Sequence, residues 1–214
     1  MLLDLLLPRR CVLCGDGGAA LCAPCAASLP ALGPPLCARC GAPTAWPVER
    51  CRECAGRRLA FVSARAAVPY DDTVRRFVRR WKEHGLRSLA TAAADVVAAR
   101  VTRPGVEVVT WVPAEAWRAR SRGHHPAERL ARELAERWAL PCRPLLVRRG
   151  PAQRQRGLSR FERQRNPAFS ALETGLRAAV VDDVYTTGAT ANAAARALAG
   201  RVDVVTLART VRRA

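Results

Sequence analysis

The sequence predicts an α/β fold in which a domain with a parallel sheet follows a small Cys-rich module. Two observations lead to this prediction. Four pairs of cysteines with the spacing C-x-x-C lie between Cys11 and Cys54. Beyond them, short apolar runs alternate with amphipathic segments, which is the pattern of strands joined by crossover helices. The 214 residues suffice for one full domain and a small appendage. We predict the module at 1–58 and the α/β domain at 59–214.

The paired cysteines predict metal binding. In a cytosolic chain such pairs bind metal rather than form disulfides. One C-x-x-C turn presents two thiolates to an ion, and two turns complete a tetrahedral zinc site. Eight thiolates therefore predict two structural Zn²⁺ sites, and both a pairing in sequence order and an interleaved pairing fit the spacing. Cys142 stands apart in an apolar run and is predicted to be a core residue. The predicted ligands are Cys11, Cys14, Cys22, Cys25, Cys37, Cys40, Cys51 and Cys54.

The elements of the α/β domain are predicted from alternating periodicities. Apolar runs rich in Val and Ala predict strands, the first of them a strand or a hairpin. Apolar residues at helical spacing, such as Val74, Phe77 and Trp81, predict helices. Pro126 is typical of a first helical turn, and Gly200 of a C-terminal cap. The predicted strands span 59–70, 106–113, 141–147, 177–183 and 201–209, and the predicted helices span 71–85, 87–101, 126–140 and 189–200.

The charge of the chain restricts its partners. The formal net charge is +18, and Lys82 is the only lysine among 36 basic residues. A strongly basic protein attracts nucleic acid or phosphate ligands, although a general enrichment in Ala and Arg through codon composition explains the charge equally well. No apolar run approaches the ~20 residues of a membrane-spanning helix, and the segment 1–11 lacks the features of a signal peptide. We therefore predict a cytoplasmic protein without membrane insertion.

The stretch VVDDVYTTGAT, residues 180–190, predicts a phosphate site. An apolar strand runs into Asp182 and Asp183, and a turn with three threonines and Gly188 leads into a helix. The carboxyl end of a parallel strand is where α/β sheets bind ligands, and the free N–H groups of a helix start bind phosphate. The two acids repel a phosphate but suit ribose hydroxyls or Mg²⁺. An ordinary N-capped helix is the alternative, but it explains only the threonines and one acid.

The same stretch resembles the PRPP-binding signature of type I phosphoribosyltransferases. Together with the Cys-rich segment and the stretches LLDLLLPRRCVLC, WKEHG, VPAEAWRARSRG and QRGLSRFERQRNPAF, the whole chain resembles the ComF/GntX family, in which a double zinc ribbon precedes a phosphoribosyltransferase-like domain. The resemblance implies that Asp182 and Asp183 bind the ribose hydroxyls of Mg-PRPP. It also implies that the 5-phosphate is bound by Thr186, Thr187, Gly188, Ala189 and Thr190.

The resemblance implies further contacts and leaves one departure. A pyrophosphate loop would follow Val112 and Pro113, and the arginine-rich segment 148–166 would cover the site as a mobile flap. The residues implied in flap or phosphate contacts are Lys82, Arg122, Gln155, Arg163 and Asn166. Where the family commonly has Arg-Gly-Phe-Asn-Gln, this chain has RGHHP at 122–126. We expect His124 and His125 to be exposed residues before a helix, with a role as replacement donors as the alternative.

Two functions follow from the resemblance. The first is a phosphoribosyltransferase, an enzyme in which a nucleophile displaces pyrophosphate from Mg-PRPP. The second is a non-catalytic protein that handles single-stranded DNA during natural transformation and keeps the phosphate site for binding or regulation. Its implied partners are single-stranded DNA and the DNA-uptake or helicase proteins. Arginines that contact a phosphate backbone would support the second function, and a dependence on Mg²⁺ would support the first.

Overall fold

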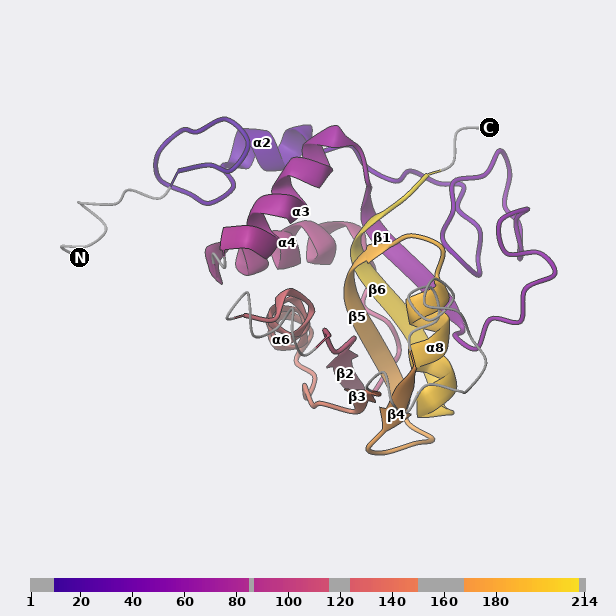
Figure 1. Cartoon of the computed structure of the whole chain (residues 1–214). Coiled ribbons are helices and arrows are strands. Elements are labelled where there is room, and N and C mark those ends of the chain that lie inside the picture. Colours follow the sequence, from indigo (N-terminus) through magenta and orange to yellow (C-terminus); the bar gives the residue numbers. More distant parts are fainter. Residues whose placement is uncertain (1–9, 85–86, 116–123, 150–167, 212–214) are drawn as a thin grey trace.

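The centre of the molecule is a four-stranded parallel sheet with the order β1-β6-β5-β2 (Figure 1). The computed structural model describes residues 10–84, 87–115, 124–149 and 168–211. The strands are β1 (Ser63–Pro69), β2 (Val108–Trp111), β5 (Arg177–Tyr185) and β6 (Arg201–Arg209). Cys142 forms a parallel bridge to Val109, on the outer side of β2. A short antiparallel pair, β3 (Leu146–Arg148) with β4 (Phe169–Ala171), lies beside the sheet.

Helices cover both faces of this sheet, which confirms the α/β fold class. They are α3 (Asp72–His84), α4 (Arg87–Arg100), α6 (Pro126–Trp138) and α8 (Ala189–Leu198), while the short helix α2 (Ala23–Ser28) has no buried residue. One apolar core joins α3, α4 and α6 to one face through residues such as Trp81 and Leu130. A second core joins α8 and the β3–β4 pair to the other face through residues such as Val180 and Leu198. No helix in the described ranges is long and apolar enough to cross a membrane.

The helices form where the apolar spacing predicts them. In α3, Val74, Phe77, Val78 and Trp81 are all buried, and the arginines between them are exposed. Pro126 opens α6 as predicted. The predicted cap at Gly200 is wrong, because the residue that takes the left-handed conformation after α8 is Ala199, at φ 48°. A Cβ atom at Gly200 would lie 2.2 Å from the Leu176 carbonyl oxygen, so this glycine allows two backbones to approach closely.

Several boundaries differ from the prediction. The segment 59–70 contains one strand and no hairpin among its residues, and its strand pairs with β6. The strand predicted at 141–147 is a single bridge at Cys142 followed by β3. The strand predicted at 177–183 continues to Tyr185, so Asp182 and Asp183 lie within the strand rather than at its last two positions. Helix α2 and strand β4 have no counterpart among the predicted elements.

The two Cys-rich ribbons pack on different sides of the α/β domain (Figure 1). Val12 and Leu29, from the first ribbon, belong to the core that contains α3, α4 and α6. Cys37, Cys40 and Cys54, from the second, belong to the core that contains α8. In Figure 1 the first ribbon, which includes α2, lies at the upper left, and the second lies at the right, beyond β1. Residues between the ribbons therefore pass from one side of the domain to the other.

Candidate functional site

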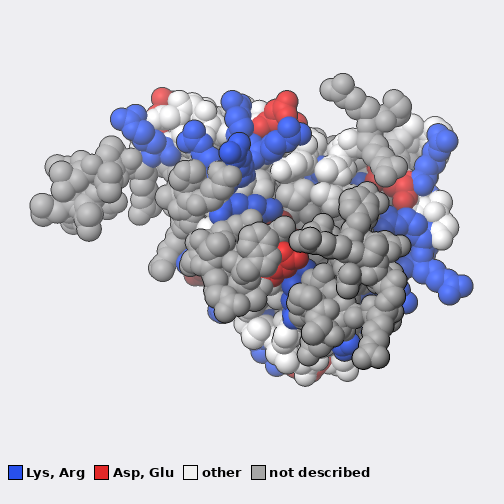
Figure 2. Space-filling view, viewed as in Figure 1, with Lys and Arg blue, Asp and Glu red and all other residues white. Residues whose placement is uncertain are grey.

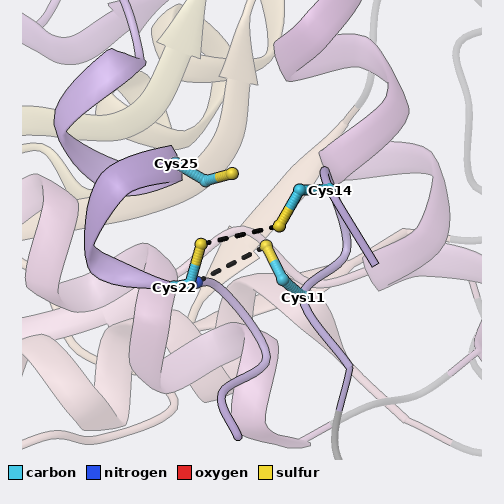
Figure 3. Close-up of side chains that lie close together, drawn as sticks. All are labelled: Cys11, Cys14, Cys22 and Cys25. Carbon is cyan, nitrogen blue, oxygen red and sulfur yellow. Dashed lines mark hydrogen bonds between the residues drawn. The ribbon is translucent and has the colours of Figure 1, made fainter. Parts of the chain in front are cut away.

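The eight paired cysteines form two separate groups of four. Cys11, Cys14, Cys22 and Cys25 make one group (Figure 3), and Cys37, Cys40, Cys51 and Cys54 make the other. Within each group all four Sγ atoms lie within 4.8 Å of one another. The pairing in sequence order is therefore the one that the chain adopts, and the interleaved pairing is excluded.

The geometry of both groups fits Zn²⁺. Four sulfurs at about 2.3 Å from an ion in a tetrahedron lie about 3.8 Å apart. The Sγ–Sγ distances are 3.7 Å for Cys14 and Cys22, 3.6 Å for Cys37 and Cys54, and 3.5 Å for Cys40 and Cys51. The N–H of Cys51 points at the Cys37 sulfur at 3.3 Å, which stabilises a thiolate. Burial opposes ionisation of Cys37, but backbone N–H groups lower the pKa of its thiol to about 7.

Zinc at both groups would supply structural cross-links and no open coordination position. Cys142 lies outside both groups and is half-buried, with the pKa of its thiol raised to about 11 by burial. It packs against the core that contains α3, α4 and α6 without being fully buried in it, so the prediction of a core residue holds only in part.

A cavity of about 370 Å³ lies at the carboxyl ends of the strands. We call it the carboxyl-edge cavity. Tyr70 follows β1, Val112 and Pro113 follow β2, and Asp182, Asp183 and Val184 lie near the end of β5, so three strands of the sheet direct residues to it. Of the predicted site residues, Lys82, Asp182, Asp183, Thr186 and Thr190 line this cavity. Residues from helix α3, strand β5 and helix α8 thus meet at one place.

The two acids have opposite electrostatic surroundings. Lys82, which is partly buried, forms an ion pair with the largely buried Asp183. Burial opposes ionisation of Asp183, but the Lys82 ammonium lowers the pKa of its carboxyl group. Burial and the neighbouring Asp183 carboxylate raise the pKa of Asp182 well above its ordinary value. The pair therefore ionises in steps, with Asp183 first and Asp182 second.

The loop before α8 has the geometry of a helix start without a side-chain cap. Gly188 precedes the helix at φ 76°, and no side chain caps the first turn. The N–H of Ala189 reaches the Thr187 hydroxyl only at 3.4 Å. A Cβ at Gly188 would lie 2.2 Å from the Tyr185 hydroxyl oxygen, so glycine is required for two reasons, conformation and space. Such a turn leaves its amide donors available to an anion.

Residues after β2 complete the cavity, and the sequence patterns did not single out most of them. Glu115, His125 and Arg148 line it together with Tyr70. The Ala114 N–H donates to His125 Nε2 at 2.7 Å, and Arg148 Nε donates to the Pro113 carbonyl at 3.0 Å. Arg148 begins the segment 148–166 that is predicted to cover the site, and the structure places it in β3. For Tyr70 and Glu115 the only signal is position, because each lies near the end of a predicted element.

The expectation that both histidines are exposed is wrong. His124 is 9% exposed, and its Nε2 donates to the Trp81 carbonyl oxygen at 3.0 Å. His125 is partly buried in the cavity wall. The chain continues directly into α6, which packs against β5 and β2, and this packing draws both rings inside. The predicted contacts at Arg122, Gln155, Arg163 and Asn166 lie outside the described residues.

Comparison with known families supports the Cys-rich part of the chain. Residues 2–55 match the model of a double zinc ribbon domain. The N-terminal part therefore consists of zinc ribbons with two clusters of four cysteines each, and a domain with a parallel sheet follows them. A search of curated proteins found no significant match to the chain.

Proposed function

We propose that the chain is a phosphoribosyltransferase-like protein that binds Mg-PRPP or a related ribose 5-phosphate ligand at the carboxyl-edge cavity. The observation that carries the proposal is that two acids and two hydroxyls line one cavity, and that the hydroxyls, from Thr186 and Thr190, belong to a loop that ends in an uncapped helix start. Asp182 and Asp183 would accept the ribose hydroxyls. Loop 186–190 would bind the 5-phosphate through its N–H groups, and the Thr186 and Thr190 hydroxyls would add donors.

The charges of the cavity support a ligand that carries its own cation. Lys82 already neutralises Asp183, and Arg148 lies 3.9 Å from Glu115, so Asp182 with its raised pKa is the remaining acid and the cavity has little net charge. A free polyphosphate would meet the carboxyl groups unfavourably, whereas Mg²⁺ bound to pyrophosphate oxygens would attract them. Arg148 and His125 lie on the wall near β2, where a pyrophosphate leaving group would be accommodated.

If the protein turns over, catalysis would consist of positioning and charge stabilisation. The nucleophile would displace pyrophosphate from C1 of the ribose, so the C1–O bond breaks as the new bond to C1 forms. Mg²⁺ would stabilise the charge on the leaving pyrophosphate when bound there. The residues of this chain would hold the ribose by its hydroxyls and its 5-phosphate, which fixes C1 relative to the nucleophile.

Calorimetric titration with PRPP and Mg²⁺ tests the proposal. The wild type is expected to bind, and the double variant Asp182→Asn/Asp183→Asn is expected to lose binding. Glu136→Gln, an exposed acid on α6, serves as the matched control and should bind like the wild type. Binding by the double variant at wild-type affinity, or no binding by the wild type with or without Mg²⁺, would overturn the proposal.

The second candidate is a protein of the competence or DNA-uptake type that binds single-stranded DNA without catalysis. The observation that favours it is a basic surface on α3, the helix that also carries Lys82. Arg75, Arg76, Arg79 and Arg80 are all exposed, and Figure 2 shows Lys and Arg side chains gathered where α3 lies. These arginines form two pairs at i,i+4 spacing, and such a surface could contact successive phosphates.

Salt dependence separates the two candidates. Binding of single-stranded DNA through arginines should weaken with salt, with a slope of about −0.7 per phosphate contact on logarithmic axes. Arg76→Ala/Arg80→Ala should reduce that slope, and Arg196→Ala on α8 should leave it unchanged. Binding of DNA without binding of PRPP would assign the chain to DNA handling, with DNA-uptake or helicase proteins as its expected partners.

A further inference from the structure

Arg209, the last residue of β6, connects the second ribbon to the sheet. Its side chain is 1% exposed. Nη1 donates to the carbonyl oxygen of Cys40, one of the cluster cysteines, and Nη2 donates to a Glu53 carboxylate oxygen at 2.8 Å. Glu53 lies between the cluster cysteines Cys51 and Cys54. Since a guanidinium buried this deeply depends on such partners, the ribbon fixes the position of Arg209.

The same guanidinium contacts Tyr185 at the end of β5. Its central carbon lies 5.3 Å from the centre of the Tyr185 ring, which is 6% exposed. The ring also meets the edge of Phe61, with centroids 6.3 Å apart. Gly188 lies directly over the phenol, where even a Cβ atom would clash. A shift of the Tyr185 ring would therefore displace the backbone of loop 186–190.

Thr210 supports the loop from the same side. Its N–H donates to the Tyr185 carbonyl oxygen at 2.9 Å, and its hydroxyl donates to the Thr186 carbonyl oxygen at 3.2 Å. The start of the loop is thus hydrogen-bonded to the residue that follows Arg209. Both the side chain and the backbone at the end of β6 contribute to its position.

The first ribbon has a comparable anchor on a different element. Arg100, at the end of α4, donates to the carbonyl oxygens of Ala26, Leu29 and Pro30. These bonds join the first ribbon to the helices on the other face of the sheet, and none of them reaches loop 186–190. The two ribbons therefore differ in what they contact, although their clusters have the same ligands.

We propose that zinc in the second ribbon sets the conformation of loop 186–190 through Arg209 and Tyr185, so that zinc at this cluster and phosphate at the loop are coupled. For the identity of the phosphate ligand, this inference rests on the proposed function. Zinc would orient the turns at Cys40 and at Cys51–Cys54, and so would fix the carbonyl and the carboxylate that Arg209 requires. The first ribbon would stabilise the fold without this coupling. Arg209 and Tyr185 are positioning residues, since neither lines the carboxyl-edge cavity.

Coupling between two sites is reciprocal in affinity, so competition for zinc at equilibrium tests it. The full-length zinc-loaded protein would be equilibrated with a zinc-selective chelator that does not bind Mg²⁺, with and without saturating Mg-PRPP, and a brief alkylation would map the free thiols. The ligand is expected to raise the affinity for zinc at Cys37, Cys40, Cys51 and Cys54 by about fivefold or more. It should leave the affinity at Cys11, Cys14, Cys22 and Cys25 unchanged. Equal effects at both clusters, or no effect while the ligand binds, would overturn the inference.

Two variants and a matched control test whether Arg209 connects the second ribbon to loop 186–190. Arg209→Met removes the charge and its hydrogen bonds, and Glu53→Gln is a milder change for the case in which the first variant does not fold. Each should weaken PRPP affinity by about fivefold or more. Arg209→Lys, which retains the charge, should recover part of the loss. Arg100→Met removes the corresponding anchor of the first ribbon and should leave PRPP affinity unchanged. An equal loss from Arg100→Met would show general destabilisation rather than coupling.

Hydrogen exchange distinguishes failure of this inference from failure of the proposed function. Amides 186–191 are expected to exchange faster in Glu53→Gln than in the wild type or in Arg100→Met, with no ligand present. If PRPP does not bind but this difference is observed, the coupling stands and the identity of the ligand is wrong. If the loop amides exchange equally in all three proteins, the coupling is wrong whatever the protein binds.

Discussion

Asp182 and Asp183 are adjacent in the chain, yet their surroundings shift their pKa values in opposite directions. Lys82 lowers the pKa of Asp183, while burial and its neighbour raise that of Asp182. An acid whose pKa is raised by folding lowers stability as the pH rises above its ordinary value, about 3.9, because the folded state disfavours the ionised form. At neutral pH Asp182 therefore lowers the free energy of unfolding, and a bound ligand could remove this destabilisation.

Asp182→Asn should therefore stabilise the ligand-free protein and impair binding. The free energy of unfolding is expected to exceed that of the wild type at pH 7, and the difference should shrink as the pH falls toward about 4, the ordinary pKa of the group; urea unfolding at the two pH values measures it. In the wild type, Mg-PRPP should bind more tightly as the pH rises toward the raised pKa, and binding should release a proton. Calorimetry in buffers of different ionisation enthalpy detects that proton. Proton release of equal size from the variant would contradict this assignment.

Gly188→Ala tests the geometry of the loop. The substituted residue would have to adopt φ 76° and would place its Cβ against the Tyr185 hydroxyl. We expect a loss of about 1–2 kcal/mol in the free energy of unfolding from the backbone conformation alone, together with loss of phosphate binding. Gly105→Ala is the control, since no atom lies within 4 Å of a Cβ there. Thermal unfolding and calorimetry would measure both effects, and a Gly188→Ala variant as stable as the control would contradict the geometry.

At the scale of elements, the sequence predicts helices and strands that have a clear apolar periodicity. It does not predict elements or buried residues that depend on contacts with distant parts of the chain. The spacing of Val74, Phe77 and Trp81 predicts α3 because one face of that helix is buried throughout. Strand β4 has only three residues and forms only because β3 lies beside it, so no local pattern marks it. The burial of His124 could not be predicted either, since its partner is a carbonyl 43 residues away in the chain.

Part of the candidate site could be predicted because its residues are close together in the sequence. Asp182, Asp183, Thr186 and Thr190 lie in one short stretch, so the sequence alone groups them. Tyr70 and Glu115 meet them because β1, β2 and β5 end at the same edge of the sheet, and Arg148 meets them because β3 lies beside that sheet. The assignment of a phosphate ligand to this group stays a prediction.

His124 lies just before α6 and donates a buried hydrogen bond to the Trp81 carbonyl in α3. Its substitution tests how much this bond contributes to the stability of the protein. In His124→Ala the Trp81 carbonyl loses its donor, and we expect a loss of about 1–3 kcal/mol in the free energy of unfolding, as for other buried groups left without a partner. Leu172→Ala, at a side chain that is 64% exposed, should change it little. Urea unfolding compares the two variants. If the two variants had equal free energies of unfolding, a water molecule would have replaced the histidine as the donor to the Trp81 carbonyl.

At the scale of the whole molecule, the two ribbons contribute to both cores of the α/β domain. The ribbons themselves contain few apolar residues, so metal supplies much of their folding free energy. Removing zinc should therefore destabilise the ribbons and the α/β domain together rather than leave an intact domain with a disordered end.

Cys51→Ser and zinc chelation test this view. Either should lower the temperature of thermal unfolding of the entire protein, because Cys37 and Cys54 pack within the core that contains α8. Cys142→Ser, at a half-buried cysteine outside the clusters, is the control for the loss of a thiol. Native mass spectrometry would count the zinc ions, and calorimetry would follow unfolding. If the temperature of the main unfolding transition stayed the same after both zinc ions were lost, the ribbons would not contribute to the stability of the α/β domain.

The pairing of β1 with β6 has a consequence for synthesis on the ribosome. Ser63 and Asp203, which are hydrogen-bonded across that pair, are 140 residues apart in the chain. The second ribbon and β1 leave the ribosome long before Arg209 and β6 are translated. Until then the surfaces of the ribbon and of β1 that these partners bury stay exposed. Exposed strand edges of this kind are sites of misassembly. Early metal capture by the nascent ribbon would protect its thiols during that interval, before the last strand closes the sheet.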